Sequence, residues 1–246
     1  MLRKRVITFL SLFFLFAFNS CTHLKENDNT IVLNEKTKQK KKDEKKKEEK
    51  QIVKENKIKK LYKNIKLEKK LDYKIFELAI KGFNKINPAN KDYITIVDLT
   101  KPSNEKRLFV INLKKNEIIF EDLVAHGMKS GDKYATSFSN KDESHKSSLG
   151  FYLTGTSYSG SNGYSLKLYG LEEGLNDNAY SRSIVIHGAD YVSFEEAKNS
   201  GRIGRSWGCL AVRKEINQEI IDTIKKDTVI FQYAKEYDDK SVILAS

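Results

Sequence analysis

The spacing of hydrophobic residues changes near residue 71 of this chain. Before that point there is one apolar run, at residues 6–18, followed by a long polar stretch. After it, apolar side chains recur three and four residues apart, which predicts an amphipathic helix. Asn87-Pro88 then interrupts the pattern and predicts its end. The apolar positions of this helix are Ile75, Phe76, Ala79, Ile80 and Phe83.

Short apolar stretches of strand length follow from residue 93 onwards. Two of them flank Lys115-Asn116, which predicts a hairpin at that pair. Residues 154–163 are rich in glycine, serine and threonine and predict a long surface loop, a kind of loop that is often functional. The predicted strands are residues 93–97, 107–113, 117–124, 150–153, 164–169, 183–186 and 228–233.

Two further helices are predicted between and after these strands. Ser193 is a suitable N-cap for a helix over residues 193–199, and its first turn holds Glu195 and Glu196, which favour the helix dipole. Isoleucines at helical spacing predict another helix over residues 216–224. Strands dominate, so the predicted fold is mainly β with a few helices (α+β). Residues 93–246 form the main domain and residues 71–92 a helical lead-in.

The N-terminus has the pattern of an export signal. Arg3, Lys4 and Arg5 precede the apolar run, which is shorter than the roughly 20 residues of a membrane span. Ser20-Cys21 follows, and this resembles a bacterial lipobox, in which the cysteine is acylated and becomes the first mature residue. The lipobox pattern prefers Leu where this chain has Phe18. We expect a lipoprotein signal peptide over residues 1–20; a plain signal peptide with Cys21 incidental is the alternative.

The net charge of +12 is concentrated in the N-terminal part of the chain. Residues 91–246 carry 21 Lys and Arg against 22 Asp and Glu, so residues 1–90 hold the whole excess. The domain is therefore near neutral, which argues against a nucleic-acid partner. Residues 36–50 contain nine lysines and four acids, and such a stretch remains solvated, whether disordered or helical. We interpret residues 21–70 as a Lys-rich tether.

Candidate chemistry is concentrated at His187 and Cys209. The histidine ends an apolar run, and the cysteine stands between a glycine-rich turn and a second apolar run. A thiol needs a base to become a nucleophile, and glycines allow a substrate backbone to approach. If Cys21 is acylated, Cys209 is the only free thiol in an exported protein, where cysteines are usually paired. A small buried hydrophobe, or a disulfide with Cys21, are the structural alternatives.

At these residues the chain resembles the L,D-transpeptidase catalytic domain family, in its murein L,D-transpeptidase branch. The resemblance runs from about residue 95 to residue 233, and several motifs occur in one order. It implies an L,D-transpeptidase-like mixed β-sheet sandwich with the catalytic cysteine at the start of a strand. The motifs are residues 98–107, 124–127, 147–152, 170–171, 176–179, 187–191 and 204–212.

The resemblance implies roles for the residues around the thiol. Cys209 would be the nucleophile and His187 its base, with the carbonyl of Gly188 orienting the ring. Backbone N–H groups near Gly208 and Cys209 would hold the oxyanion, and Ser206 would shape the turn. Better-known members have Ser-His-Gly-Cys where this chain has Ser206-Trp207-Gly208-Cys209. The second histidine is absent, and we interpret the Trp form as a variant of this branch.

Four residues are candidates for substrate binding. Arg205 suits the free carboxylates of a stem peptide, although a surface arginine without a special role is the alternative. Tyr191 and Trp207 would form a groove wall, or belong to the core. His126 precedes a glycine at a strand end and faces either the cleft or a structural hydrogen bond. No cofactor is expected, and the sequence has no metal-ligand motif.

The implied substrate is the peptide stem of bacterial peptidoglycan. Cys209 would attack the third stem residue, release D-Ala and transfer the acyl group to a neighbouring amine, forming a 3–3 cross-link. Hydrolysis by an L,D-carboxypeptidase or endopeptidase is the alternative within the same chemistry, and a non-catalytic wall-binding lipoprotein is the alternative outside it. We expect an exported cell-envelope protein, anchored to a membrane through Cys21 and facing the periplasm or cell wall.

Overall fold

The computed structural model of the chain describes residues 26–238 and 240–245. The predicted signal peptide, residues 1–20, and the lipidation site Cys21 lie outside the described residues. The chain divides into two compact units, Met1–Ile52 and Val53–Ser246. Within the described ranges, no helix combines the length and the apolar character that a membrane span requires.

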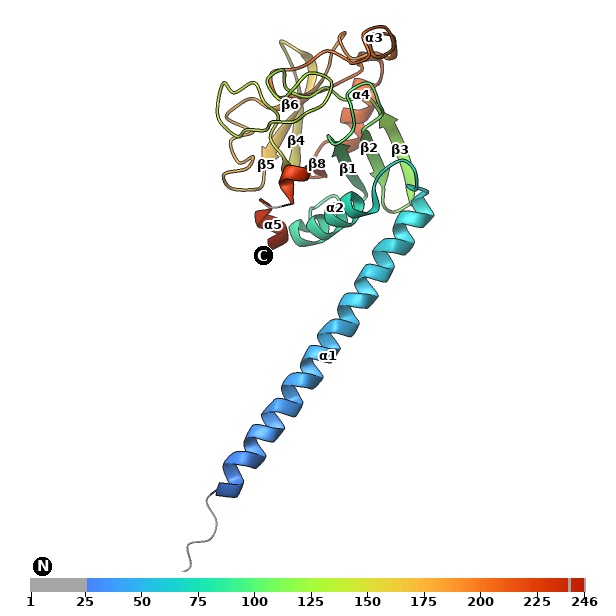
Figure 1. Ribbon diagram of the computed structural model, residues 1–246. Helices are drawn as coiled ribbons and strands as arrows, with labels where there is room; N and C mark the ends of the chain where they lie inside the picture. Colours follow the sequence, from blue (N-terminus) through green and yellow to red (C-terminus); the bar gives the residue numbers. More distant parts are fainter. Residues whose placement is uncertain (1–25, 239, 246) are drawn as a thin grey trace, which may run out of the picture. The chain divides into compact units, whose positions relative to one another are not determined.

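Helix α1 (Glu26–Ile65) contains the lysine-rich stretch (Figure 1). Residues 44–54 are all solvent-exposed, as expected for a charged segment. Further along, Ile58, Tyr62 and Ile65 are buried in the core of the second unit. The chain therefore becomes part of the core from Ile58, earlier than the predicted end of the tether, because these apolar side chains recur on one face of the helix.

Helix α2 (Tyr73–Ile86) is the helix predicted before the strands. Asp72 caps it by accepting a hydrogen bond from the N–H of Lys74 at 2.7 Å. Asn87 ends it in the left-handed conformation, at φ 50°, where the sequence predicted the break. A Cβ at Gly82 would lie 2.0 Å from the ring of Phe151. A glycine is therefore needed for the helix to approach the sheet so closely.

Within residues 26–238 and 240–245, eight strands form one mixed sheet, in the order β3-β2-β1-β8-β4-β5-β6-β7. The pairs β1–β8 and β6–β7 are parallel, and the remaining pairs are antiparallel. The prediction of a sheet-rich fold with few helices is confirmed, and the described strands are joined in one continuous sheet. They are β1 (Tyr93–Asp98), β2 (Leu108–Asn112), β3 (Glu117–Asp122), β4 (Gly150–Gly160), β5 (Gly163–Gly170), β6 (Val185–Gly188), β7 (Leu210–Val212) and β8 (Val229–Tyr233).

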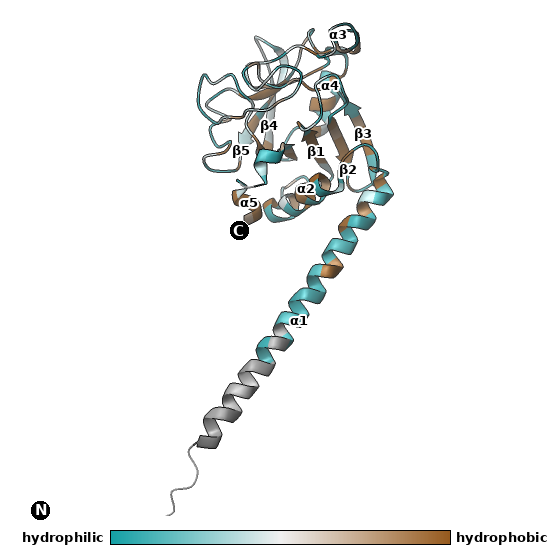
Figure 2. Ribbon diagram, in the orientation of Figure 1, coloured by the Kyte–Doolittle hydropathy of each residue, from teal (hydrophilic) through white to brown (hydrophobic). Residues whose placement is uncertain are grey.

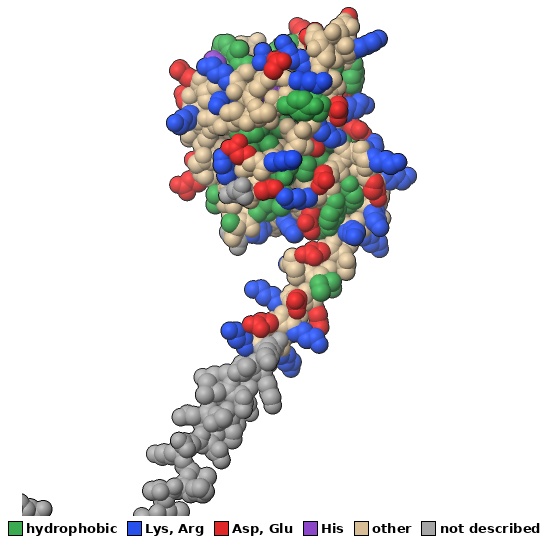
Figure 3. Space-filling model, viewed as in Figure 1, with side chains coloured by type: hydrophobic (Ala, Val, Ile, Leu, Met, Phe, Trp, Pro, Cys, Tyr) green, Lys and Arg blue, Asp and Glu red, His purple; other side chains and the backbone are tan. Residues whose placement is uncertain are grey.

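Strands β1, β2 and β8 contribute many residues to the hydrophobic core of the domain. Every residue of β2 and β8 is buried. In Figure 2 the hydrophobic colour is concentrated on β1 and β2, while the coloured part of α1 is mostly hydrophilic. Phe151 and Phe231 stack across the β4–β8 pair, with ring centroids 4.3 Å apart. On the face shown in Figure 3, Lys and Arg side chains are interspersed with Asp and Glu, in keeping with the near-neutral charge of residues 91–246.

Shorter helices complete the fold. Helix α3 (Phe194–Asn199) has the predicted cap, because Ser193 Oγ accepts a hydrogen bond from the N–H of Glu196 at 3.0 Å. Helix α4 (Lys214–Ile224) buries Ile220, Ile221 and Ile224, the face predicted from their spacing. The C-terminal part contains a 3₁₀ helix, η1 (Lys235–Tyr237), and helix α5 (Val242–Ala245).

Residues 154–163 differ from their prediction. They were expected to form a loop, but most of them extend β4 and pair with β5 as far as Gly160 opposite Gly163. Only Ser161 and Asn162 connect the two strands, and Gly163 accommodates a positive φ of 74°. The prediction failed because small polar residues show no hydrophobic alternation, whereas the strand is held by its ladder to β5.

The two edges of the sheet are linked just before the candidate site. Ala125, which follows β3, forms an antiparallel bridge to Ala211 of β7, and Gly127 forms a bridge to Ser206. Arg213, which follows β7, donates to the carboxylate of Asp122 at the end of β3, at 2.6 Å. These contacts fix the turn that carries Cys209 against a segment about 80 residues earlier in the chain.

Candidate active site

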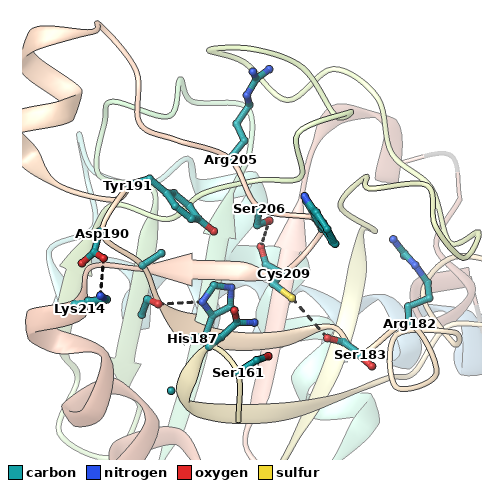
Figure 4. Close-up of a pocket in the computed structure, with 15 residues that line it drawn as sticks. Ser161, Arg182, Ser183, His187, Asp190, Tyr191, Arg205, Ser206, Cys209 and Lys214 are labelled. Atoms are coloured by element: carbon teal, nitrogen blue, oxygen red, sulfur yellow. Dashed lines mark hydrogen bonds and ion pairs between the residues drawn. The ribbon is translucent and has the colours of Figure 1, made fainter. Parts of the chain in front are cut away.

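A cavity of about 740 Å³ opens beside β6 and β7 (Figure 4). It is bordered by the tip of the β4–β5 hairpin, by the segment that follows β6 and by the turn that precedes β7. Most of the sequence-predicted site residues meet here. They are His187, Gly188, Tyr191, Arg205, Ser206, Trp207 and Cys209.

The strand register explains why His187 and Cys209 face the same cavity. In the parallel β6–β7 pair, His187 stands opposite Ala211. Cys209 lies in the turn directly before β7, so the pairing of β7 with β6 brings this turn close to His187. Both side chains border the cavity, as Figure 4 shows.

The imidazole of His187 is held by the backbone of the next residue. Its Nδ1 lies 3.0 Å from the carbonyl oxygen of Gly188, the contact that the resemblance implied. A carbonyl can only accept a hydrogen bond, so Nδ1 carries the proton and Nε2 keeps a free lone pair. Burial lowers the pKa of His187, and the bond to Gly188 opposes this shift in part. The ring is therefore neutral near pH 7, as a base must be.

The thiol of Cys209 is half-buried and directed towards the chain before β6. Its Sγ lies 3.6 Å from the carbonyl oxygen of Ser183, which accepts the S–H. Burial raises the pKa of this thiol, while a backbone hydrogen bond from Val185 and the charge of Arg182 act in the opposite direction. A protonated thiol beside a neutral imidazole requires proton transfer before it can attack a carbonyl.

Ser206 organises the turn that presents the thiol. Its Oγ donates to the carbonyl oxygen of Cys209 at 2.7 Å and accepts from the N–H of Gly208 at 3.1 Å. Gly208 has φ 120°, and a Cβ there would lie 2.9 Å from the carbonyl oxygen of Lys146. The N–H of Gly208, predicted as an oxyanion donor, is thus already used within the turn, and this residue contributes its conformation instead.

Two aromatic side chains border the cavity. The side chain of Trp207 is 72% exposed and stacks on His145, with ring centroids 4.9 Å apart and planes 9° from parallel. Tyr191 lies over Gly204, where a Cβ would be 2.5 Å from the tyrosine Cβ. Burial, and then the negative charge of an ionised Cys209, raise the pKa of Tyr191 to about 12, so its hydroxyl is a hydrogen-bond donor near pH 7.

Arg205 also borders the cavity, but its charge is partly engaged. Its Nη1 donates to the carbonyl oxygen of Gly131 at 3.1 Å and lies 3.3 Å from a carboxylate oxygen of Asp132. Because Asp132 is 68% exposed, an incoming carboxylate can compete for the guanidinium.

His126, predicted to face either the cleft or a structural hydrogen bond, does not line the cavity. The side chain is buried, and its Nδ1 accepts a hydrogen bond from Nη2 of Arg107 at 2.8 Å. Burial, and then the charge of Arg107, lower the pKa of His126 to about 4. Ala125 pairs with β7, and the side chain of the following residue, His126, points into the interior of the domain. His126 therefore has the structural role that was the alternative.

Sequence reasoning missed Arg182, which borders the cavity beside the thiol (Figure 4). Its guanidinium donates to the carbonyl oxygens of Ser139 and Lys146, both at 2.8 Å. It also donates to the hydroxyls of Ser144 and Ser148. These four acceptors are uncharged, so they hold the guanidinium without neutralising it. A single arginine between serines gave no signal, because its four acceptors come from a loop about 40 residues earlier.

Among the described residues, no group of three or more His, Cys, Asp or Glu is placed to hold a metal ion. The site consists of a thiol, an imidazole, backbone donors and two arginines. This set can transfer acyl groups through a thioester, because it has a nucleophile, a base for its proton and positive charge beside it.

Comparison with known proteins identifies one family. A model of the L,D-transpeptidase catalytic domain matches residues 67–233, about two thirds of the chain. No curated protein matches. Solved structures with similarity include an L,D-transpeptidase from Mycobacterium smegmatis, with 10% identity and TM-score 0.36, covering 58% of this chain and 59% of that chain. Another is Bdellovibrio bacteriovorus Bd1075, with 20% identity and TM-score 0.36, covering 61% of this chain and 52% of that one.

A third solved structure is an Enterococcus faecium L,D-transpeptidase C442S mutant, with 12% identity and TM-score 0.32, covering 58% of this chain and 50% of that chain. The matches thus span between half and three fifths of the length of these three solved chains. The family assignment rests on the family model alone.

Proposed function

The chain belongs to the L,D-transpeptidase catalytic domain family, and on this premise we propose that it transfers acyl groups between peptidoglycan stem peptides through a thioester on Cys209. The main support is that His187 and Cys209 border one cavity, the histidine from β6 and the cysteine from the turn before β7. The Nδ1 of His187 is held by the carbonyl oxygen of Gly188, so Nε2 is the ring nitrogen that can accept a proton.

In the first half-reaction, Nε2 of His187 takes the proton of the Cys209 thiol. The sulfur attacks the carbonyl carbon of the third stem residue, and the N–H of Cys209 stabilises the oxyanion that forms. The carbon–nitrogen bond to the terminal D-Ala then breaks, and the imidazolium returns its proton to the departing amine. A thioester remains on Cys209.

In the second half-reaction, an amine from a neighbouring stem attacks the thioester. His187 removes the proton of that amine, the carbon–sulfur bond breaks, and the thiolate regains a proton from the imidazolium. The product is a 3–3 cross-link. With water in place of the amine the same steps give hydrolysis, so the product distinguishes a transpeptidase from a carboxypeptidase or endopeptidase.

Arg205 and Trp207 are assigned to binding the stem. Arg205 would exchange its contact with the exposed carboxylate of Asp132 for a carboxylate of the substrate, and Trp207 would provide an exposed wall. Tyr191 would donate its hydroxyl to a substrate oxygen, since its raised pKa keeps it protonated.

The test begins with a carbapenem, a class of compound that acylates the cysteine of this family. The intact mass of the protein should increase by one adduct, and Cys209→Ala should remain unmodified. Cys209→Ala combined with Ser200→Cys is the matched control, because it keeps the number of cysteines and moves one thiol from the cavity to an exposed helix end. An equal adduct on that control, or none on the wild type, would refute the proposal and favour a non-catalytic wall-binding protein.

A second measurement defines the reaction. Stem peptides from purified wall fragments are incubated with the protein and analysed by mass spectrometry. Dimers linked 3–3 support the transpeptidase, whereas stems shortened by one D-Ala without dimers support the hydrolase.

We also propose that the protein is exported and anchored to a membrane by acylation of Cys21. A lipidated Cys21 would begin a charged segment that leads to the domain. Labelling cells with a fatty-acid analogue should modify the wild type and not Cys21→Ser. Equal labelling of both proteins would contradict the anchor.

A further inference from the structure

A group of exposed aromatic side chains lies on the β4–β5 hairpin and the loop before β6. Tyr169 and Tyr180 stack, with ring centroids 5.1 Å apart and planes 15° from parallel. The Nζ of Lys167 lies 5.6 Å from the ring centre of Tyr158 and 5.9 Å from that of Tyr180. These four residues are called the tyrosine platform below.

The rings of the platform lie against glycines. A Cβ at Gly155 would be 2.6 Å from Cε2 of Tyr169, and one at Gly160 would be 2.7 Å from Cε2 of Tyr158. The missing side chains therefore leave room for the rings to rest on the hairpin backbone. Tyr158, Tyr169 and Tyr180 nevertheless remain 37, 40 and 54% exposed, which is unusual for large aromatic side chains grouped together.

The platform continues the face of the sheet that carries the active site. Lys167 of β5 stands opposite Val185 of β6, and Ser165 stands opposite His187. Lys167 and Tyr169 follow Ser165 at steps of two, so they share its face, while Leu166 and Leu168 point into the core. From Ser165 to Tyr169 the strand advances about 13 Å.

A second cavity, of about 460 Å³, lies beside the platform. It is lined by Tyr158, Lys167 and Tyr180 from the platform, and by Ser183 and Val185 from the chain leading into β6. Ser183 also borders the active-site cavity, and its carbonyl oxygen accepts the S–H of Cys209. The two cavities therefore have Ser183 in common, the residue whose carbonyl oxygen contacts the thiol.

We propose that the tyrosine platform binds the glycan strand of peptidoglycan while the active site holds the attached stem. This inference rests on the proposed function. Sugar rings present faces of C–H groups that pack on aromatic rings, and their hydroxyls and amides suit flanking serines and one lysine. In an extended stem, two residues separate the sugar from the third residue, about 7 Å of chain. The stem would therefore extend over part of the roughly 13 Å between Ser165, which stands opposite His187, and Tyr169.

The test uses the full-length protein and glycan strands from which an amidase has removed all peptides. The wild type should bind these strands in isothermal titration, and Tyr169→Ala with Tyr180→Ala should weaken binding on the order of tenfold. Tyr180→Phe keeps the aromatic ring, so this single variant should bind the strands more tightly than the single variant Tyr180→Ala. Phe194→Ala is the matched control, because Phe194 is a 45% exposed aromatic on α3, where its ring contacts Arg213.

Several outcomes would overturn the platform. The first is that the folded wild type does not bind the glycan strands. The second is that the double alanine variant binds them as tightly as the wild type. The third is that Phe194→Ala loses as much affinity as the double variant. A change of oligomeric state in the double variant without a change in glycan affinity would assign the tyrosines to self-association instead. Cys209→Ala should bind the strands with the affinity of the wild type. The proposal on glycan binding is therefore tested separately from the carbapenem reaction, which tests the proposed enzymatic function.

Discussion

The Nδ1 atom of His187 lies 3.0 Å from the carbonyl oxygen of Gly188. This contact with the adjacent residue fixes both the orientation of the imidazole and the position of its proton. The carbonyl carries no full charge, so it orients the base while raising its pKa less than a carboxylate would. Burial dominates, and the histidine is available in its neutral form over most of the physiological range.

The acid side of the pH–rate profile should reflect His187. Because burial lowers its pKa below the ordinary 6.5, the neutral base persists as the pH falls, and acylation by a carbapenem should decline only below about pH 6.5. His187→Gln should reduce the acylation rate by about 10²- to 10⁴-fold and remove this decline. Rates measured by mass spectrometry from pH 5 to 9 test this. A midpoint above pH 7 in the wild type would contradict it.

The pH at which the Cys209 thiol becomes reactive should depend on Arg182. Its positive charge lowers the pKa of the Cys209 thiol, against the larger effect of burial, so Arg182→Gln should shift the iodoacetamide alkylation profile to higher pH. Arg182→Lys retains the charge and should shift the profile less. Because the guanidinium also holds the loop around Lys146, thermal unfolding is measured for both variants. Identical profiles in the three folded proteins would show that Arg182 is only structural.

The stability of the domain should fall in acid partly because of His126. Its pKa is about 4 in the folded protein and about 6.5 when unfolded, so the unfolded chain binds more protons between these values. Stability present above pH 6.5 is therefore lost as the pH falls towards 4, and His126 alone should cost roughly 2 kcal/mol between pH 7 and 5. Urea unfolding of His126→Gln should show a smaller pH dependence. An unchanged dependence of the free energy of unfolding on pH in His126→Gln would contradict this account.

Gly208 should be needed for the reaction and not only for the fold. Gly208→Ala forces a Cβ to 2.9 Å from the carbonyl oxygen of Lys146 at φ 120°, and the turn before Cys209 must shift. Gly201→Ala is the matched control, because Gly201 also has a positive φ, 67°, but nothing lies within 4 Å of its Cβ position. Each should lose about 1–3 kcal/mol of stability. Only Gly208→Ala should lose most of its acylation by a carbapenem. Equal acylation of Gly208→Ala and Gly201→Ala would show that Gly208 is not needed for the reaction.

Trp207 should affect binding more than folding. Its side chain is 72% exposed, and its stacking partner is His145, so Trp207→Ala should change the free energy of unfolding by no more than about 0.5 kcal/mol. The KM for a tetrapeptide stem should increase, because the substrate loses one wall of its groove. Unfolding curves and steady-state kinetics together test this, and a large loss of stability with an unchanged KM would indicate a packing role.

Most of the fold followed from local patterns in the sequence. The strands with buried isoleucine and valine, the cap at Ser193 and the helix end at Asn87 were predicted because each depends on neighbouring residues. Residues 154–160 of β4 were not predicted as a strand, because serine, glycine and threonine acquire strand structure there only through pairing with β5. The burial of Ile58 was missed because the apolar residues near the end of helix α1 are few and stand among many charged ones.

The candidate site was predictable to the same extent. His187, Ser206 and Cys209 lie in short motifs that carry their own geometry, and the structure brings them to one cavity. His126 and Arg182 required knowledge of contacts that are distant in sequence. His126 is turned inward to Arg107, and Arg182 is held by the loop containing residues 139–148. Neither arrangement leaves a pattern that can be read along the chain.

The bridge between Ala125 and Ala211 has a consequence for rearranging the gene. Because the chain after β3 pairs directly with the strand that follows the thiol, the two halves of the domain cannot be separated into independent modules. New chain ends introduced at Ser161 and Asn162, where two exposed residues join β4 to β5, should leave a permuted protein able to fold. A cut between residues 123 and 127 would release the support on which the cysteine turn rests.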